Sequence, residues 1–114
     1  MLIVISLIMY DEARKKDIFF PNHIKDVANA LRWTVNNIEN YGGDPTNIFL
    51  IGHSAGAHMV TLLTFHDEYQ KIVFQEPSEF KKRVKGVIGI SGCYNISRMW
   101  DIHFIARIFY CEPA

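Results

Sequence analysis

The sequence has little cysteine, no excess charge of either sign and no long hydrophobic run. Cys93 and Cys111, the only cysteines in 114 residues, are too few for a disulfide framework and lack neighbours at the spacing of a zinc site. Twelve Lys and Arg balance twelve Asp and Glu, which argues against nucleic-acid binding and a polybasic membrane anchor. The longest apolar run, residues 2–10, is far shorter than the roughly 20 residues that span a bilayer.

The overall composition predicts one small globular domain. Hydrophobic residues make up 49% of the chain and charged residues 21%, a balance that argues against disorder. No positive residues precede the first apolar run and no small-residue cleavage site follows it, so a signal peptide is not expected. Two reduced thiols and a cytoplasmic location are therefore the default expectation. The sequence predicts no metal or organic cofactor.

Strand-like and helix-like segments alternate along the chain. Short apolar runs rich in β-branched residues predict three buried strands, at residues 2–9, 47–51 and 84–91. Apolar spacing of three and four predicts a helix from Ile24 to Tyr41, ended by Gly42, and a second helix follows the second strand. This order is typical of an α/β fold with a three-stranded, mostly parallel sheet and flanking helices.

Two remaining segments have a weaker pattern. Residues 66–83 are polar, contain Pro77 and end in three basic residues, so we expect a loop with at most a helical turn at 69–74. Residues 97–110 mix aromatic and aliphatic side chains with polar ones and predict an amphipathic helix. An apolar tail and free strand edges together favour self-association.

The pattern Gly-x-Ser-x-Gly occurs at residues 52–56, between a predicted buried strand and a predicted helix. In that setting the serine occupies a tight, strained turn at the carboxyl end of a strand, and glycines two residues away on either side prevent a collision. The motif therefore predicts a nucleophile elbow, with Ser54 as the nucleophile and the backbone N–H of Ala55 as a donor to an oxyanion. The alternative is a glycine-bounded turn whose serine merely caps the helix.

Several longer segments strengthen the motif. Residues 20–27, 30–33, 41–45, 51–58 and 86–92 together resemble the α/β-hydrolase esterases. The nearest groups are the carboxylesterase-like branch containing kynurenine formamidase, the feruloyl-esterase-like proteins and the isoprenylcysteine methylesterases. The resemblance covers about residues 2–96 and leaves 97–114 as a divergent tail. It implies that Ser54 accepts an acyl group and that Ala55 contributes to the oxyanion hole.

The same resemblance implies that the chain is a single incomplete α/β-hydrolase domain. In the family, the His-Gly-Gly oxyanion loop precedes the first strand seen here, and the catalytic acid and histidine follow later strands. A further family strand lies between the first two strands of this chain, so these two must pair directly or leave a gap. A sheet this small can be covered by helices only in part.

The histidines of the chain are poor substitutes for the missing base. In the family, His53 packs beneath the elbow, and His58 belongs to the motif without being the base. The best alternative is His103, which follows Asp101 by two residues but lies at the wrong place in the family order. His23 and His66 are expected at helix ends.

Two classes of function remain open. One is a serine hydrolase acting on a small carboxylic ester or amide through an acyl-Ser54 intermediate, of which this sequence is an internal piece. The other is a catalytically inactive truncated product, or an interaction module, that retains the elbow. An upstream His-Gly-Gly and a downstream Asp and His would favour the enzyme.

Overall fold

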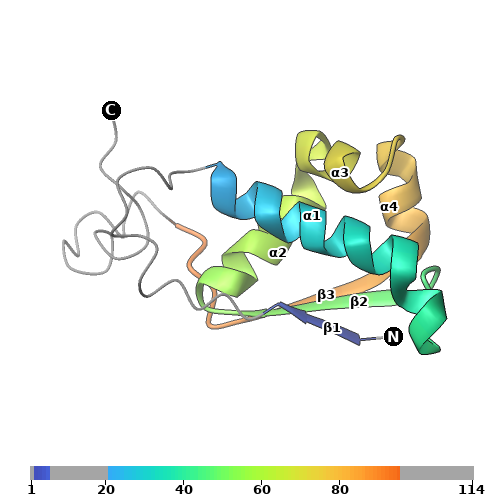
Figure 1. Cartoon of the computed structure of the whole chain (residues 1–114). Helices are drawn as coiled ribbons and strands as arrows, with labels where there is room; N and C mark the ends of the chain where they lie inside the picture. Colours follow the sequence, from blue (N-terminus) through green and yellow to red (C-terminus); the bar gives the residue numbers. More distant parts are fainter. Residues whose placement is uncertain (1, 6–20, 96–114) are drawn as a thin grey trace.

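The computed structural model describes residues 2–5 and 21–95, which form a small sheet with helices packed on it (Figure 1). The predicted helix at 97–110 and Cys111 lie outside these ranges. The elements in chain order are β1 (Leu2–Ile5), α1 (Asn22–Asn37), the 3₁₀ helix η2 (Ile38–Tyr41), β2 (Ile48–His53), α2 (Ala55–Phe65), α3 (Asp67–Val73), α4 (Pro77–Arg83) and β3 (Val84–Ile90). None of the described helices is long and apolar enough to cross a membrane. The arrangement is compatible with the expected partial α/β fold.

The sheet has the order β1-β2-β3, and both pairs of strands are parallel. β1 pairs directly with β2, from Leu2 opposite Phe49 to Ile5 opposite Gly52. Of the two arrangements left open by the sequence, direct pairing is therefore the one observed. β2 and β3 run side by side to their carboxyl ends, where His53 lies opposite Ile90.

The helix predicted between the first two strands is present, with a tighter last turn. α1 buries Ile24, Val27, Ala28 and Leu31 on one stripe, as its apolar spacing requires. The 3₁₀ turn η2 continues it and ends at Gly42, whose φ of 79° is the left-handed conformation that favours glycine. The predicted glycine stop is confirmed.

The expectation of a loop at residues 66–83 is wrong, because two short helices occupy this segment. α3 begins at Asp67 directly after the extended residue His66. α4 begins at Pro77, which suits a first helical position because its missing N–H would have no partner there. Glu79 then pairs with Lys82 and Arg83 one turn later, at 2.7 and 3.4 Å. The proline that suggested a loop starts a helix instead.

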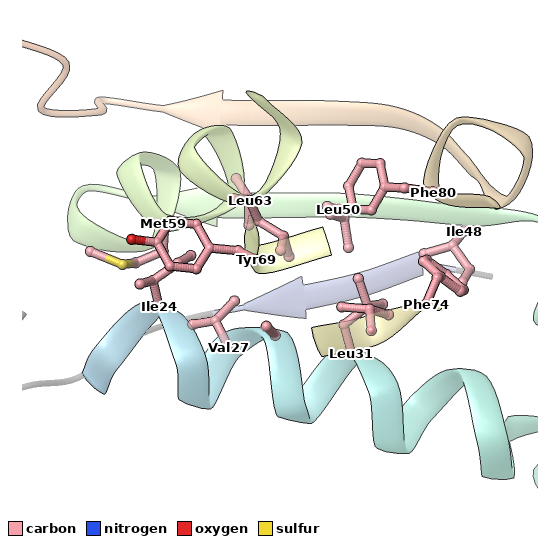
Figure 2. Packing of buried hydrophobic residues seen from close by; sticks show 13 residues of the cluster. Ile24, Val27, Leu31, Ile48, Leu50, Met59, Leu63, Tyr69, Phe74 and Phe80 are labelled. Carbon is pink, nitrogen blue, oxygen red and sulfur yellow. The ribbon is translucent and has the colours of Figure 1, made fainter. Parts of the chain in front are cut away.

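The helices cover one face of the sheet (Figure 1). Ile48 and Leu50 point from β2 into this layer and are fully buried. Figure 2 shows them among side chains from α1, α2 and α3, including Leu31, Leu63 and Tyr69. Fully burying an aliphatic side chain contributes roughly 1.5–3 kcal/mol, so this cluster is the main source of stability in the described part of the chain.

The opposite face of the sheet is open. Phe49 lies between the buried residues Ile48 and Leu50 of β2, while Ile88 and Ile90 lie two residues apart on β3. These three side chains are 37%, 49% and 48% exposed. This face is open because of the topology. The connections from β1 to β2 and from β2 to β3 step in the same direction across the sheet, and right-handed connections in one direction place their helices on the same face. No described helix packs against these three side chains.

Candidate functional site

Ser54 lies at the abrupt turn between β2 and α2, at the carboxyl end of the sheet. Its backbone has φ 54° and ψ −117°, a conformation that costs a non-glycine residue free energy and is held by its surroundings. The Ser54 N–H donates to the carbonyl oxygen of Ile90, at 2.9 Å, which fastens the turn to the end of β3. The turn is therefore strained locally and supported from the neighbouring strand.

The glycines of the motif make this turn sterically feasible. A Cβ at Gly52 would overlap the carbonyl group of Gly56 and lie 2.6 Å from the amide nitrogen of Ala57. Strand and helix thus meet backbone against backbone across the turn. Because nothing flexible lies at that contact, a side chain at position 52 would push α2 away from β2.

The hydroxyl of Ser54 is not used to cap α2. Ser54 occupies the N-cap position, but its side chain makes no capping hydrogen bond. The alternative interpretation, in which Ser54 is a capping serine, therefore finds no support in the geometry. The side chain is partly exposed, whereas Ala55 is buried and begins the helix. Amides of the first helical turn have no intrahelical acceptor and carry the positive end of the helix dipole, which suits an anion beside Ser54.

The opposite end of α2 is held by a residue that the sequence did not single out. The side-chain amide of Gln70 donates to the carbonyl oxygens of Leu63 and Thr64, at 3.1 and 2.7 Å. These carbonyls belong to the last turn of α2, where intrahelical donors run out. Gln70, which is 2% exposed, therefore fixes the helix that carries Ser54. Its position in a segment expected to be a loop hid this role.

Among residues 21–95, no histidine contacts the hydroxyl of Ser54 in the manner of a general base. His53 is exposed on the open face of the sheet, so the family-based expectation that it packs beneath the elbow is wrong. His66 is exposed at the end of α2, and its ring lies 6.0 Å from that of Tyr69. His23 is in the first turn of α1. His103 and Asp101 lie outside the described residues.

His58 is placed one helical turn after Ser54 and is half-buried. Its backbone N–H donates to the carbonyl oxygen of Ser54, at 3.2 Å. Burial lowers the pKa of the His58 ring, and a hydrogen bond with the backbone of Cys93 opposes part of that shift. A bond that raises the pKa of a histidine favours its protonated ring, which can only donate, so the backbone partner is the Cys93 carbonyl.

The described residues contain no group of three or more His, Cys, Asp and Glu side chains that could hold a metal ion. Cys93 is a half-buried free thiol. At the carboxyl end of the sheet, the Ser54 hydroxyl lies beside the first backbone amides of α2 and makes no capping hydrogen bond to that helix.

The chain matches the family model BD-FAE over residues 4–106, which is most of its length. A probable isoprenylcysteine alpha-carbonyl methylesterase of Oryza sativa subsp. japonica is 35% identical over 88 residues, covering 76% of this chain and 20% of the relative. A probable carboxylic ester hydrolase of Mycobacterium tuberculosis, LipM, is 38% identical over 84 residues, covering 72% of this chain and 19% of the relative.

The chain therefore spans about a fifth of the length of these curated relatives. No solved structure matches it. The relatives carry the names of ester hydrolases, and the resemblance to α/β-hydrolase esterases inferred from the sequence is confirmed. The chain belongs to the BD-FAE family of α/β-hydrolase-like domains.

Proposed function

We propose that this chain carries the nucleophile of a serine hydrolase that cleaves carboxylic esters, and amides of similar shape. The observation that carries the proposal is the backbone of Ser54, which is held at φ 54° between β2 and α2 by the close contact of Gly52 with Gly56. The names of the relatives as carboxylic ester hydrolases and methylesterases support the ester as substrate class.

The proposed reaction is a two-step acyl transfer. The Ser54 oxygen bonds to the ester carbonyl carbon while a base takes its proton, and the alcohol leaves with that proton. Water then adds to the acyl carbon, the acid departs and the serine hydroxyl is restored. The Ala55 amide donates to the oxyanion of each tetrahedral intermediate, where the helix dipole also favours negative charge.

The base, the acid and further oxyanion donors are proposed to come from outside the described residues. The four described histidines lie in α1, at the end of β2, in α2 and after α2, and none bonds the Ser54 hydroxyl. Without such partners a serine hydroxyl is a weak nucleophile. Residues 21–95 alone are therefore expected to be nearly inactive, and the working enzyme is expected to include the triad partners of a longer polypeptide.

A fluorophosphonate probe tests the proposal directly. A native lysate is treated with the probe, the Ser54 peptide is sought by mass spectrometry, and the size of the labelled band is read. We expect label on Ser54 in a band several times the mass of this chain. Label at the chain's own mass would point to a base within it, and His103 would be the first residue to replace.

Serine variants control for the site of labelling. Ser54→Ala should remove the label, whereas Ser78→Ala, an exposed serine of α4, should retain it. If the Ser54 peptide is detected without label, the hydrolase proposal is wrong for this chain. The remaining hypotheses would then be an inactive truncated product or an interaction module that retains the elbow.

A further inference from the structure

The segment after β3 begins directly beside the elbow. Ser54 and Ser91 are the two non-glycine residues with positive φ among the described ranges, at 54° and 50°. They follow neighbouring parallel strands, and the Ser54 N–H donates to the carbonyl of Ile90, the residue before Ser91. The strained turn at Ser91 redirects the chain at the same edge of the sheet as the candidate nucleophile.

After Ser91 the chain folds back onto the first turns of α2. The ring of His58 is hydrogen-bonded to the backbone of Cys93. This bond joins the segment after β3 to α2, one helical turn beyond Ser54. The contact is half-buried, so it is only partly weakened by competition with water. We refer to residues 91–95 as the β3 loop.

The side chain of Tyr94 makes the second attachment of the β3 loop. A Cβ at Gly89 or at Gly92 would overlap the phenol end of Tyr94, and the one at Gly89 would also lie 3.4 Å from the Cβ of Ala57. The hydroxyl end of Tyr94 thus fills a notch that only glycine leaves open, beside the first turn of α2. Tyr94 is nevertheless 55% exposed, so an aromatic surface remains uncovered next to this turn.

The two stretches of sequence that supply β2, α2 and the β3 loop carry no acidic, lysine or arginine side chain around Ser54 and Tyr94. Residues 48–66 contain none, and neither do residues 86–97. A neutral apolar group is the ligand that an exposed aromatic ring in such surroundings favours.

We propose that the exposed ring of Tyr94 contacts the apolar part of the ester next to the scissile carbonyl, and that His58 is the positioning residue that holds this ring beside Ser54. The inference rests on the hydrolase function proposed above. It adds a substrate preference of the enzyme, which is for neutral esters with an aliphatic or aromatic acyl group. Neither Tyr94 nor His58 takes part in the transfer of the acyl group.

The kinetic test uses the polypeptide that the fluorophosphonate labels, with p-nitrophenyl esters from acetate to octanoate. For Tyr94→Ala we expect KM for the octanoate to rise about tenfold with kcat within threefold, while KM for the acetate hardly changes, because only the longer chain reaches the ring. Tyr94→Phe should retain the preference for long chains. Tyr41→Ala removes a tyrosine that is 71% exposed on η2 and is the matched control.

The positioning role of His58 has its own readout. His58→Ala should reproduce the loss of chain-length preference, and His58→Gln should restore it, because a glutamine amide can donate to the Cys93 carbonyl. Hydrogen exchange of the amides of residues 93–95 should accelerate about tenfold in His58→Ala and return toward the parent rate in His58→Gln. A purely structural role would instead change all esters alike.

The outcomes separate the two proposals. If Ser54→Ala retains ester hydrolysis, the hydrolase function is wrong, and this inference falls with it. If Ser54 is required but Tyr94→Ala leaves the ester series unchanged, only the aromatic contact is wrong. If exchange at residues 93–95 is the same in His58→Ala as in the parent, His58 does not position the loop.

Discussion

The two faces of the sheet are built from the same strands but have opposite surroundings. On the covered face, Ile48 and Leu50 are fully buried beneath the helices. On the open face, Phe49, Ile88 and Ile90 are between 37% and 49% exposed. Both sets are apolar, so composition does not distinguish them. The direction of the crossovers decides which set is buried, and with it where a substitution is costly.

Two glycines on opposite faces should show the largest contrast. Gly52→Ala places a methyl group against the backbone of Gly56 and Ala57, which can yield only if α2 moves. We expect a loss of about 3 kcal/mol or more of unfolding free energy. Gly86→Ala meets only the Phe49 ring, at 3.0 Å, and the ring can turn aside.

Urea unfolding followed by circular dichroism measures both glycine variants. Gly86→Ala should remain within about 1 kcal/mol of the parent, since alanine also reduces the entropy of the unfolded chain. Equal losses would show that the contact of Gly52 with Gly56 is no tighter than an ordinary contact between side chains.

Truncation of aliphatic residues gives the next contrast. Leu50→Ala opens a cavity in a fully buried site and should cost about 2–5 kcal/mol. Ile88→Ala removes a side chain that is 49% exposed and should cost about 1 kcal/mol or less. The same unfolding experiment measures both. A loss at Ile88 as large as that at Leu50 would mean that the open face is covered in solution.

His58, which lies in α2 on the covered face, should contribute to the change of stability with pH. Burial lowers its pKa, so between its ordinary value and the lowered value the unfolded chain binds more protons than the folded one. Stability is therefore expected to fall as the pH falls from about 7.5 to 5.5 through the ordinary histidine pKa. His58→Gln should flatten this slope in urea midpoints.

His53→Gln, at an exposed position on the open face, is the matched control for the pH experiment. Asp44 and Glu79 do not affect this comparison, because their carboxyl groups titrate below the pH range of the experiment. Their pKa values are lowered from 3.8 and 4.5 by hydrogen bonds to Thr46 and to Lys82, so they lose their contribution only at more acidic pH. An unchanged slope in His58→Gln would contradict the expected role of the buried ring.

The open face should give the smallest change in stability and a clear change in association. Ile88→Thr combined with Ile90→Thr replaces two exposed apolar side chains by residues that also suit a strand. We expect the unfolding free energy to change by about 0.5 kcal/mol or less, while light scattering at increasing protein concentration decreases. Unchanged scattering would show that this face does not drive self-association.

Several features could be predicted because they depend on residues close in sequence. The glycines at 52 and 56 and the serine between them specify a tight turn wherever a strand precedes a helix. The apolar stripe of α1 and the left-handed stop at Gly42 are equally local. The sequence does not predict the helices at 66–83, because Pro77 is compatible with both a loop and a first helical turn. Tyr69 and Phe80, one in each helix, pack into the core.

The sequence by itself determined the three strands, the helices α1 and α2 and the tight turn that contains Ser54, because apolar spacing and backbone sterics act over a few residues. The tertiary structure decided the direct pairing of β1 with β2, the face that stays open, and the contact of His58 with Cys93. These depend on which distant segments meet, and a hydrophobic pattern leaves several such pairings close in free energy.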